Sequence, residues 1–248
     1  MNAVYVLWLR QMKRYMRSRA RIVGSLGQPV LYLVALGFGF GPVFQKAGQG
    51  SYLQFLAPGV IGMTVLFSAI FSGIELIWDR QFGFLKEVLV APVSRLSIMV
   101  GRTVGGATVS ILQGVIVAVV CLIAGFRPAN ASALPYAFLF MALIAVMFTA
   151  LGTAIASALT DFQGFQIVMN FLVMPIFFLS GALYPLAHAP KGLQIVAALD
   201  PLAYGIDGMR AALIGSAHFG AAADLAVLTA ATVCLVGLGT YLFSRIEL

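Results

Sequence analysis

Residues 128–160 read PANASALPYAFLFMALIAVMFTALGTAIASALT, a run of 33 residues without a charged side chain. A helix that spans a membrane needs about 20 consecutive apolar residues, so this run is long enough to cross a bilayer. The rest of the chain is similar, since 61% of its 248 residues are hydrophobic, 9% are charged, and the mean hydropathy is +1.01. Water-soluble domains are nearer half apolar and a quarter charged, so an ordinary soluble domain is excluded.

Five further charge-free runs cover residues 22–45, 47–74, 103–126, 162–190 and 225–244. Because a spanning segment must satisfy its backbone hydrogen bonds internally, we expect each run to form a helix. The sequence therefore predicts an all-α membrane protein with one transmembrane domain over residues 1–248. Its six spans are expected near residues 23–44, 56–77, 104–125, 136–159, 165–184 and 225–243.

The Lys and Arg residues are divided unevenly between the two sides that six spans create. Eleven of the fifteen lie in the segment before the first span, in the 78–103 loop and in the tail. Cytoplasmic segments of membrane proteins carry such an excess, so both termini are expected in the cytoplasm. The net charge of +7 is then a topology signal, and we expect membrane lipid rather than nucleic acid as a partner.

Residues 1–21 have the pattern of an amphipathic helix. On a helical wheel the apolar side chains gather on one face and most basic ones opposite; the two groups are Val4, Leu7, Trp8, Met12, Tyr15 and Met16, and Arg10, Lys13, Arg14, Arg17 and Arg21. This pattern predicts a helix in the plane of the membrane surface. Its role is either a lipid anchor or a lever that touches a partner.

The loop over residues 78–103 contains the stretch DRQFGFLKEVLVAPVSR, residues 79–95. It is too apolar for a free loop and too charged to cross a membrane. A short helix that ends before Pro92, followed by a new helix capped by Ser94, fits the local rules. Such a helix either lies on the membrane or binds a partner protein.

The segment over residues 185–224 is interrupted by prolines and glycines, so it cannot be one continuous span. Its apolar residues still permit a re-entrant helix where neighbouring protein shields the broken backbone. A plain external loop is the alternative interpretation.

Small polar residues recur every four positions on two predicted spans; they are Thr64, Ser68 and Ser72, and Thr149, Thr153 and Ser157. Such stripes indicate either close helix packing or a mildly polar wall. Glu75 is the one carboxylate near a span interior, and its position predicts a solvated charge at the cytoplasmic end of the second helix.

Nothing in the sequence indicates catalysis, a cofactor site or a metal site. No phosphate-binding G-x-x-x-x-G-K-[ST] loop occurs, so the chain is not expected to hydrolyse ATP alone. His188 and His218 both fall in the 185–224 segment, and Cys121 and Cys234 have no metal or disulfide spacing.

Four groups of residues together resemble the ABC-2 type permeases, the membrane subunits of ATP-driven exporters of drugs, lipids and lipo- or oligosaccharides. They are Phe55-Leu56-Ala57-Pro58-Gly59, residues 87–95, Phe178-Leu179-Ser180-Gly181 with Tyr184-Pro185, and Asp200-Pro201-Leu202-Ala203-Tyr204-Gly205. The resemblance includes the daunorubicin-exporter and nodulation-factor-exporter branches of this family. Asp79-Arg80 is a variant of the family's more usual Glu-Arg, so we assign Asp79 no role.

The resemblance implies two permease copies, each seated on a separate ABC ATPase subunit that binds ATP and Mg, in a bacterial or archaeal cytoplasmic membrane. It implies that the 78–103 loop carries the coupling helix that docks on the ATPase, and that residues 185–224 form external re-entrant helices. The expected docking residues are Phe82, Phe84, Leu85, Glu87, Val88, Leu89, Pro92 and Arg95. If spans two and five face each other across the dimer axis, the expected pathway residues are Thr64, Phe67, Ser68, Phe71, Asn170, Phe171, Phe177 and Phe178.

The resulting expectation is a permease subunit that exports an amphiphilic drug, lipid or lipid-linked glycan from the cytoplasm or inner leaflet. Three alternatives stay open at this point: an ion-coupled secondary transporter, an exporter specific for oligosaccharides or polysaccharides, and a scaffold subunit without a pathway.

Overall fold

The chain is mostly helical in the part that the computed structural model describes, residues 3–46, 51–90, 92–159 and 161–245, and no strand occurs there. The side chains of Arg21 and Leu89 lie outside this description. The longer elements are α1 (Ala3–Arg17), α2 (Arg19–Tyr32), α3 (Gly39–Lys46), α4 (Tyr52–Phe71), α5 (Ile74–Gln81), α6 (Phe84–Val90), α7 (Arg95–Ile123), α8 (Leu134–Ala158), α9 (Phe162–Val168), α10 (Met174–Leu179), α11 (Lys191–Leu199), α12 (Pro201–Ile214) and α13 (Ala221–Ser244).

Six helical segments of the described residues are long and apolar enough to cross a membrane, as predicted. They are Ile22–Lys46, Tyr52–Gln81, Arg95–Ile123, Ala131–Ala158, Phe162–Leu179 and Ala221–Ser244. The third begins nine residues before the predicted start, directly after the Ser94 that was expected to cap a helix. The Ser94 hydroxyl indeed accepts a hydrogen bond from the backbone N–H of Ser97, at 3.2 Å.

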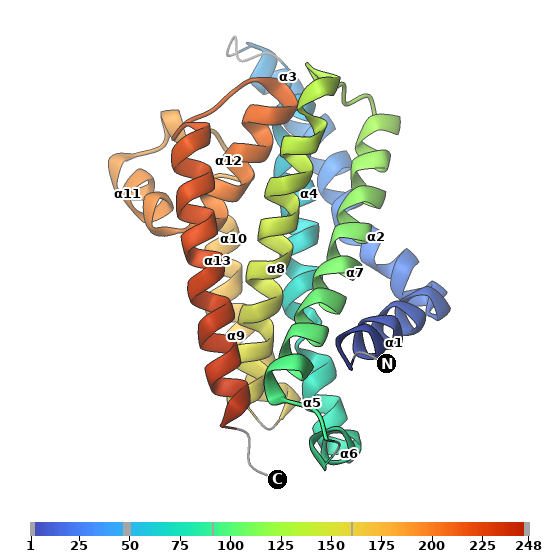
Figure 1. The fold of residues 1–248 in the computed structure, drawn as a ribbon. Helices are drawn as coiled ribbons and strands as arrows, with labels where there is room; N and C mark the ends of the chain where they lie inside the picture. Colours follow the sequence, from blue (N-terminus) through green and yellow to red (C-terminus); the bar gives the residue numbers. More distant parts are fainter. Residues whose placement is uncertain (1–2, 47–50, 91, 160, 246–248) are drawn as a thin grey trace.

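The spans run up and down through one bundle (Figure 1). α8 lies in its middle, packed against α4, α7, α12 and α13. α6 lies at one end, which we call the α6 end; α1 crosses beside α7 near it, and α13 ends there. α3 lies at the opposite end, the α3 end.

Glycine lets the central helices approach one another closely. A Cβ atom built on Gly152 of α8 would lie 2.5 Å from the backbone carbonyl oxygen of Ile70 in α4, and one built on Gly106 of α7 would lie 2.7 Å from the methyl group of Thr149. Thr149 and Thr153 are both buried in these contacts. The polar stripe on the fourth span therefore packs helices together, which is the usual function of small residues in membrane proteins.

The first and fifth spans contain widened helical turns, η1 (Leu33–Phe38) and η3 (Met169–Val173). Each is followed within four residues by a proline, Pro42 or Pro175, which has no N–H to donate and displaces the carbonyl four residues earlier. Those carbonyls belong to Phe38 and Phe171, which lie inside the widened turns, so the prolines account for the irregular backbone.

The 185–224 segment folds into separate short helices, and α12 among them packs into the bundle. Its Leu202 and Ile206 are buried against α4 and α8, and Gly205 and Gly208 leave room for side chains of α8. α12 ends at Gly215, whose φ of 71° is a left-handed conformation that glycine adopts without strain.

Candidate functional site

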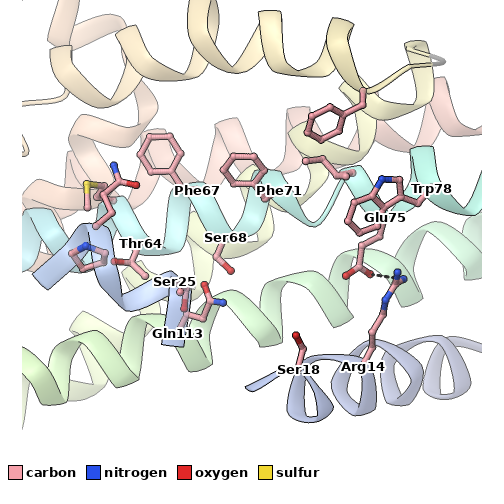
Figure 2. A pocket seen from close by; sticks show the side chains of 16 residues that line it. Arg14, Ser18, Ser25, Thr64, Phe67, Ser68, Phe71, Glu75, Trp78 and Gln113 are labelled. Atoms are coloured by element: carbon pink, nitrogen blue, oxygen red, sulfur yellow. Dashed lines mark ion pairs between the residues drawn. The ribbon is translucent and has the colours of Figure 1, made fainter. Parts of the chain in front are cut away.

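A cavity of about 680 Å³ lies between the first two spans, and its lining extends along the second span from Met63 in α4 to Trp78 in α5 (Figure 2). It takes residues from α1, α2, α4, α5, α7 and α9. Its lining comprises Arg14, Ser18, Gly24, Ser25, Gln28, Pro29, Met63, Thr64, Phe67, Ser68, Phe71, Ile74, Glu75, Trp78, Gln113 and Phe162. We call it the central cavity.

Two unlike walls of the central cavity come from opposite sides of α4. Figure 2 shows Phe67 and Phe71 projecting to one side of this helix, while Thr64 and Ser68 project to the other, toward Gln113 of α7. The polar side belongs to a hydrogen-bonded contact between helices, because the hydroxyl of Ser110 donates to that of Ser68 at 3.1 Å. The cavity thus offers aromatic surface and hydrogen-bonding groups to the same ligand.

The expected pathway residues divide between the cavity and other places. Thr64, Phe67, Ser68 and Phe71 line the cavity. The other four come from the fifth span and do not line it: Phe177 is fully buried against Phe67 and Tyr32, while Asn170, Phe171 and Phe178 are exposed on the surface of the chain.

Sequence reasoning missed several polar residues of the cavity, namely Gln113, Ser25 and Gln28. One signal could have found Gln113, because it is the one amide side chain within the charge-free run 103–126. The residues of the first span carry no comparable signal, since serine and glutamine also occur on lipid-facing helix ends.

Asp79 joins three elements at the α6 end, although no local pattern in the sequence assigned it a role. Arg10 of α1 donates to both of its carboxylate oxygens, at 2.7 and 3.2 Å, and Arg102 of α7 donates to one of them. Asp79 and Arg102 are each only 5% exposed. We call these three residues the Asp79 cluster. It fixes α1 against the second and third spans by charge-assisted hydrogen bonds.

Glu75 is also buried, and the prediction of a solvated charge at a helix end was wrong. Its side chain is 6% exposed, lines the central cavity and lies 3.8 Å from the guanidinium of Arg14. That guanidinium also lies over the ring of Trp78, 5.8 Å from its centroid. The side chain of Arg14 reaches this face of α5 from α1, so position along the helix did not predict exposure.

The expected docking residues lie on and around α6. The ring of Phe82 is 84% exposed, and Glu87 and Pro92 are also on the surface. Leu85 is buried in the core, and Phe84 lies beneath the guanidinium of Arg10, 3.8 Å from its ring centroid. The remaining positions are Val88, which is half-buried beside α1, Leu89, whose side chain lies outside the described residues, and Arg95.

Two arginines tie the region around α6 to the carbonyl ends of other spans. Arg95 donates to the backbone oxygen of Ser244 at the end of α13, at 2.6 Å. Arg80 donates to the backbone oxygens of Leu159 and Ser157 at the end of α8, at 2.9 and 3.3 Å. Helix carboxyl ends have carbonyls without intrahelical partners and favour a positive charge, so both contacts are stabilising.

A second group of buried charges lies toward the α3 end. The Asp200 carboxylate caps α12 by accepting a hydrogen bond from the N–H of Leu202 at 2.9 Å, and burial raises the pKa of this carboxyl to about 7. Arg210 donates to the backbone oxygen of Gly181 at 3.2 Å, and burial lowers its pKa to about 10 although Asp207 opposes the shift. No three His, Cys, Asp or Glu side chains in the described ranges come together as metal ligands would.

The sequence profile of the ABC-2 type transporter family matches residues 2–214. The chain belongs to this family. Its relatives include the ycf38 protein of Pyropia yezoensis, with 34% identity over 78% of this chain and 68% of the relative. Nodulation protein J of Rhizobium leguminosarum bv. viciae is 30% identical over 84% of this chain and 81% of its own length. The inner membrane transport permease YadH of Escherichia coli K12 is 27% identical, over 86% and 83%.

Family membership and the six apolar helices make this chain a multi-pass membrane protein and a permease. The resemblance noted in the sequence is thereby confirmed. The features described above then have a context: the central cavity lies inside a transport protein, and the Asp79 cluster holds its first helix.

Proposed function

We propose that this permease is the membrane subunit of an ATP-driven exporter that moves an amphiphilic drug, lipid or lipid-linked glycan out of the cytoplasm or inner leaflet. The central cavity is the observation that carries the proposal. It has the size and the mixed apolar and polar lining of a small-molecule site, and its lining includes Arg14 and Trp78, which lie toward the end that the charge distribution assigns to the cytoplasm.

Two copies of the permease form the transporter in this proposal. In the apolar 18-residue stretch of the first, fifth and sixth spans, only 11, 22 and 17% of the residues are buried within one chain. The corresponding share in the second span is 83%. The first and fifth spans carry exposed aromatic rings, including Phe38 and Phe171. A second copy that covers the exposed surface of the first and fifth spans would place two central cavities on either side of a shared pathway.

A separate ATPase, with ATP and Mg bound to it, supplies the energy. α6 is its docking element, because α6 and its flanking residues place Phe82, Glu87 and Val90 on the surface beyond the spans. Movement of the ATPase passes through α6 to α8 and α13 by the contacts of Arg80 and Arg95, and to α1 and α7 by the Asp79 cluster. The permease thus moves as a set of rigid helices.

The test is ATP-dependent export by the permease assembled with its ATPase. Phe82→Ala combined with Glu87→Lys should abolish export and cargo-stimulated ATP hydrolysis, with the permease still present in the membrane. Phe138→Ala is the matched control, because this ring is half exposed on α8, far along the chain from α6. Export that continues unchanged in the double variant would exclude the docking role of α6.

A bulky residue in the cavity tests the cargo site separately. Ser68→Phe fills the polar wall, so it should lower export by roughly tenfold or more while the ATPase still binds. Ser132→Phe, at an exposed position outside the cavity, should leave export unchanged. Equal export from both variants would show that cargo takes another route.

One observation favours a second candidate, an ion-coupled carrier: Glu75 is a buried carboxylate in the second span and lines the cavity. This candidate predicts transport by the permease alone in proteoliposomes under a proton or sodium gradient, and its loss in Glu75→Gln. The exporter predicts no transport under these conditions.

A further inference from the structure

A second cavity, of about 900 Å³, lies between α1 on one side and α5 and α6 on the other. We call it the arm groove. It is lined by Val6, Leu9, Arg10, Lys13, Arg14, Arg17, Ser18, Trp78, Asp79, Phe82 and Phe84.

The arm groove adjoins the central cavity. Arg14, Ser18 and Trp78 line both, and Figure 2 shows these three side chains among those around the central cavity. A ligand that occupies both spaces would pass these three side chains. Its part in the arm groove would lie at the end of the bundle, and its other part would lie between the spans.

The arm groove has a surplus of positive charge. Four cations line it against one carboxylate, Asp79, which already binds Arg10 and Arg102. Arg14 has Glu75 as its partner. Lys13 and Arg17, in contrast, form no ion pair with any residue that the structure describes. Two positive charges therefore remain for an external anion.

The start of α2 adds to this charge. Ser18 precedes the helix, and its hydroxyl makes no capping hydrogen bond to the backbone. The first N–H groups of a helix have no intrahelical acceptor and attract anions, most strongly when basic side chains surround them. Ser18 itself lies at the junction, because it lines both cavities.

We propose that the arm groove binds the phosphate-bearing headgroup of an anionic lipid of the inner leaflet, whose acyl chain extends into the central cavity. This names the headgroup class of the exported amphiphile and rests on the proposed function. A lipid fits better than an acidic protein segment because the apolar wall of Val6, Leu9 and Phe82 continues past Trp78 to the rings of the central cavity.

Trp78 provides a direct readout, because the chain has only one other tryptophan, Trp8. In a Trp8→Phe background the permease is reconstituted, without any ATPase, into vesicles of phosphatidylcholine with increasing fractions of chain-brominated phosphatidylglycerol. Brominated phosphatidylcholine in plain phosphatidylglycerol vesicles is the reverse arm. Bromine quenches tryptophan at contact, so stronger quenching of Trp78 by the anionic lipid at equal mole fraction is expected.

Lys13→Gln with Arg17→Gln should reduce the relative affinity for the anionic lipid about 30-fold, since each basic residue near the membrane surface contributes about 1 kcal/mol to binding an anionic lipid. Both ion pairs, to Asp79 and Glu75, stay intact in this variant. Arg19→Gln with Lys86→Gln is the matched control, because it removes the same charge at the same end without touching the groove.

Four results with the permease alone would overturn the inference. They are no preference for the anionic lipid, a preference that survives Lys13→Gln with Arg17→Gln, an equal loss in the control variant, and full displacement by glycerol phosphate, which would indicate a site for free phosphate. Loss of the preference when the partner ATPase is added would assign the groove to protein docking and would overturn it too. Because the vesicles contain no ATPase, a failure of ATP-driven export would leave this binding result unaffected, so the two failures are distinguishable.

Discussion

Replacing Asp79 by asparagine removes the one negative charge that two arginines share. The amide of this variant could still accept a hydrogen bond, but Arg102 would keep its charge at 5% exposure without its counter-ion. Breaking a buried ion pair in this way costs about 3–5 kcal/mol. Arg10 adds less, because its side chain is 34% exposed and reaches water, so Arg10→Gln should cost only about 1 kcal/mol.

A double variant separates charge from packing. In Asp79→Leu with Arg102→Met neither member of the buried pair remains, so its loss of stability should be smaller than that of Asp79→Asn alone. The measurement is unfolding of the purified permease by SDS in mixed micelles, followed by tryptophan fluorescence. The rate at which a protease cuts between α1 and α2 reports whether α1 detaches.

If the stability of Asp79→Asn lies within about 1 kcal/mol of the wild type, the Asp79 cluster contributes less than a buried ion pair should, and its assigned role is refuted. A double variant that is less stable than Asp79→Asn would refute it too, because packing rather than an uncompensated charge would then dominate. Faster cleavage between α1 and α2 in Asp79→Asn, with the spans still folded, would locate the damage at α1.

Three further predictions concern other parts of the fold. Gly152→Ala would place a methyl group against the carbonyl oxygen of Ile70 and should destabilise the permease by about 1–3 kcal/mol in SDS unfolding. Gly39→Ala should not, because a methyl group at Gly39 would enter open space. Equal stabilities of the two variants would contradict the close approach of α4 and α8. The pKa of Asp200 is raised from its unfolded value near 4 to about 7, so the folded state binds the proton more tightly and stability should fall as pH rises from about 4 to 7. Asp200→Asn keeps an oxygen that can accept the capping hydrogen bond from Leu202, and it should flatten the stability profile between about pH 4 and 7. A profile that the substitution leaves unchanged would argue against the raised pKa of Asp200. Arg95→Gln removes the bond to the carboxyl end of α13 and should speed hydrogen exchange in its last turn, and unchanged protection would deny Arg95 this role.

The positions of the spans followed from the sequence because a bilayer imposes a local rule. Any segment without charges and long enough to cross must be helical, whatever its neighbours are. The beginning of α7 after Ser94 was also predictable, since capping depends on residues a few positions apart. The end of the fifth span was less predictable. The sequence predicted an end at residue 184, but the helix ends at Leu179, because Gly181 adopts a φ of 73° that turns the chain.

The cavity was only partly predictable. The four-residue spacing placed Thr64 and Ser68 on one face of the second span, but it could not say what that face meets. On the fourth span the same spacing buries Thr149 and Thr153 against neighbouring helices. Both stripes meet α7, but of the two only the second-span stripe also lines the cavity, through Thr64 and Ser68. Where packed helices leave a space between them is a property of the tertiary structure.

The sequence by itself determined that this chain is a helical membrane protein of the ABC-2 type, because apolar length, basic asymmetry and short motifs are properties of the chain read in order. Only the tertiary structure decided which of its charged side chains are buried and which of them form ion pairs. Glu75 and Asp79 look like groups at a solvated helix end until α1 folds back over them, and Arg10 reaches Asp79 across 69 positions of sequence. Burial and ion pairing depend on distances between helices, and no local pattern carries that information.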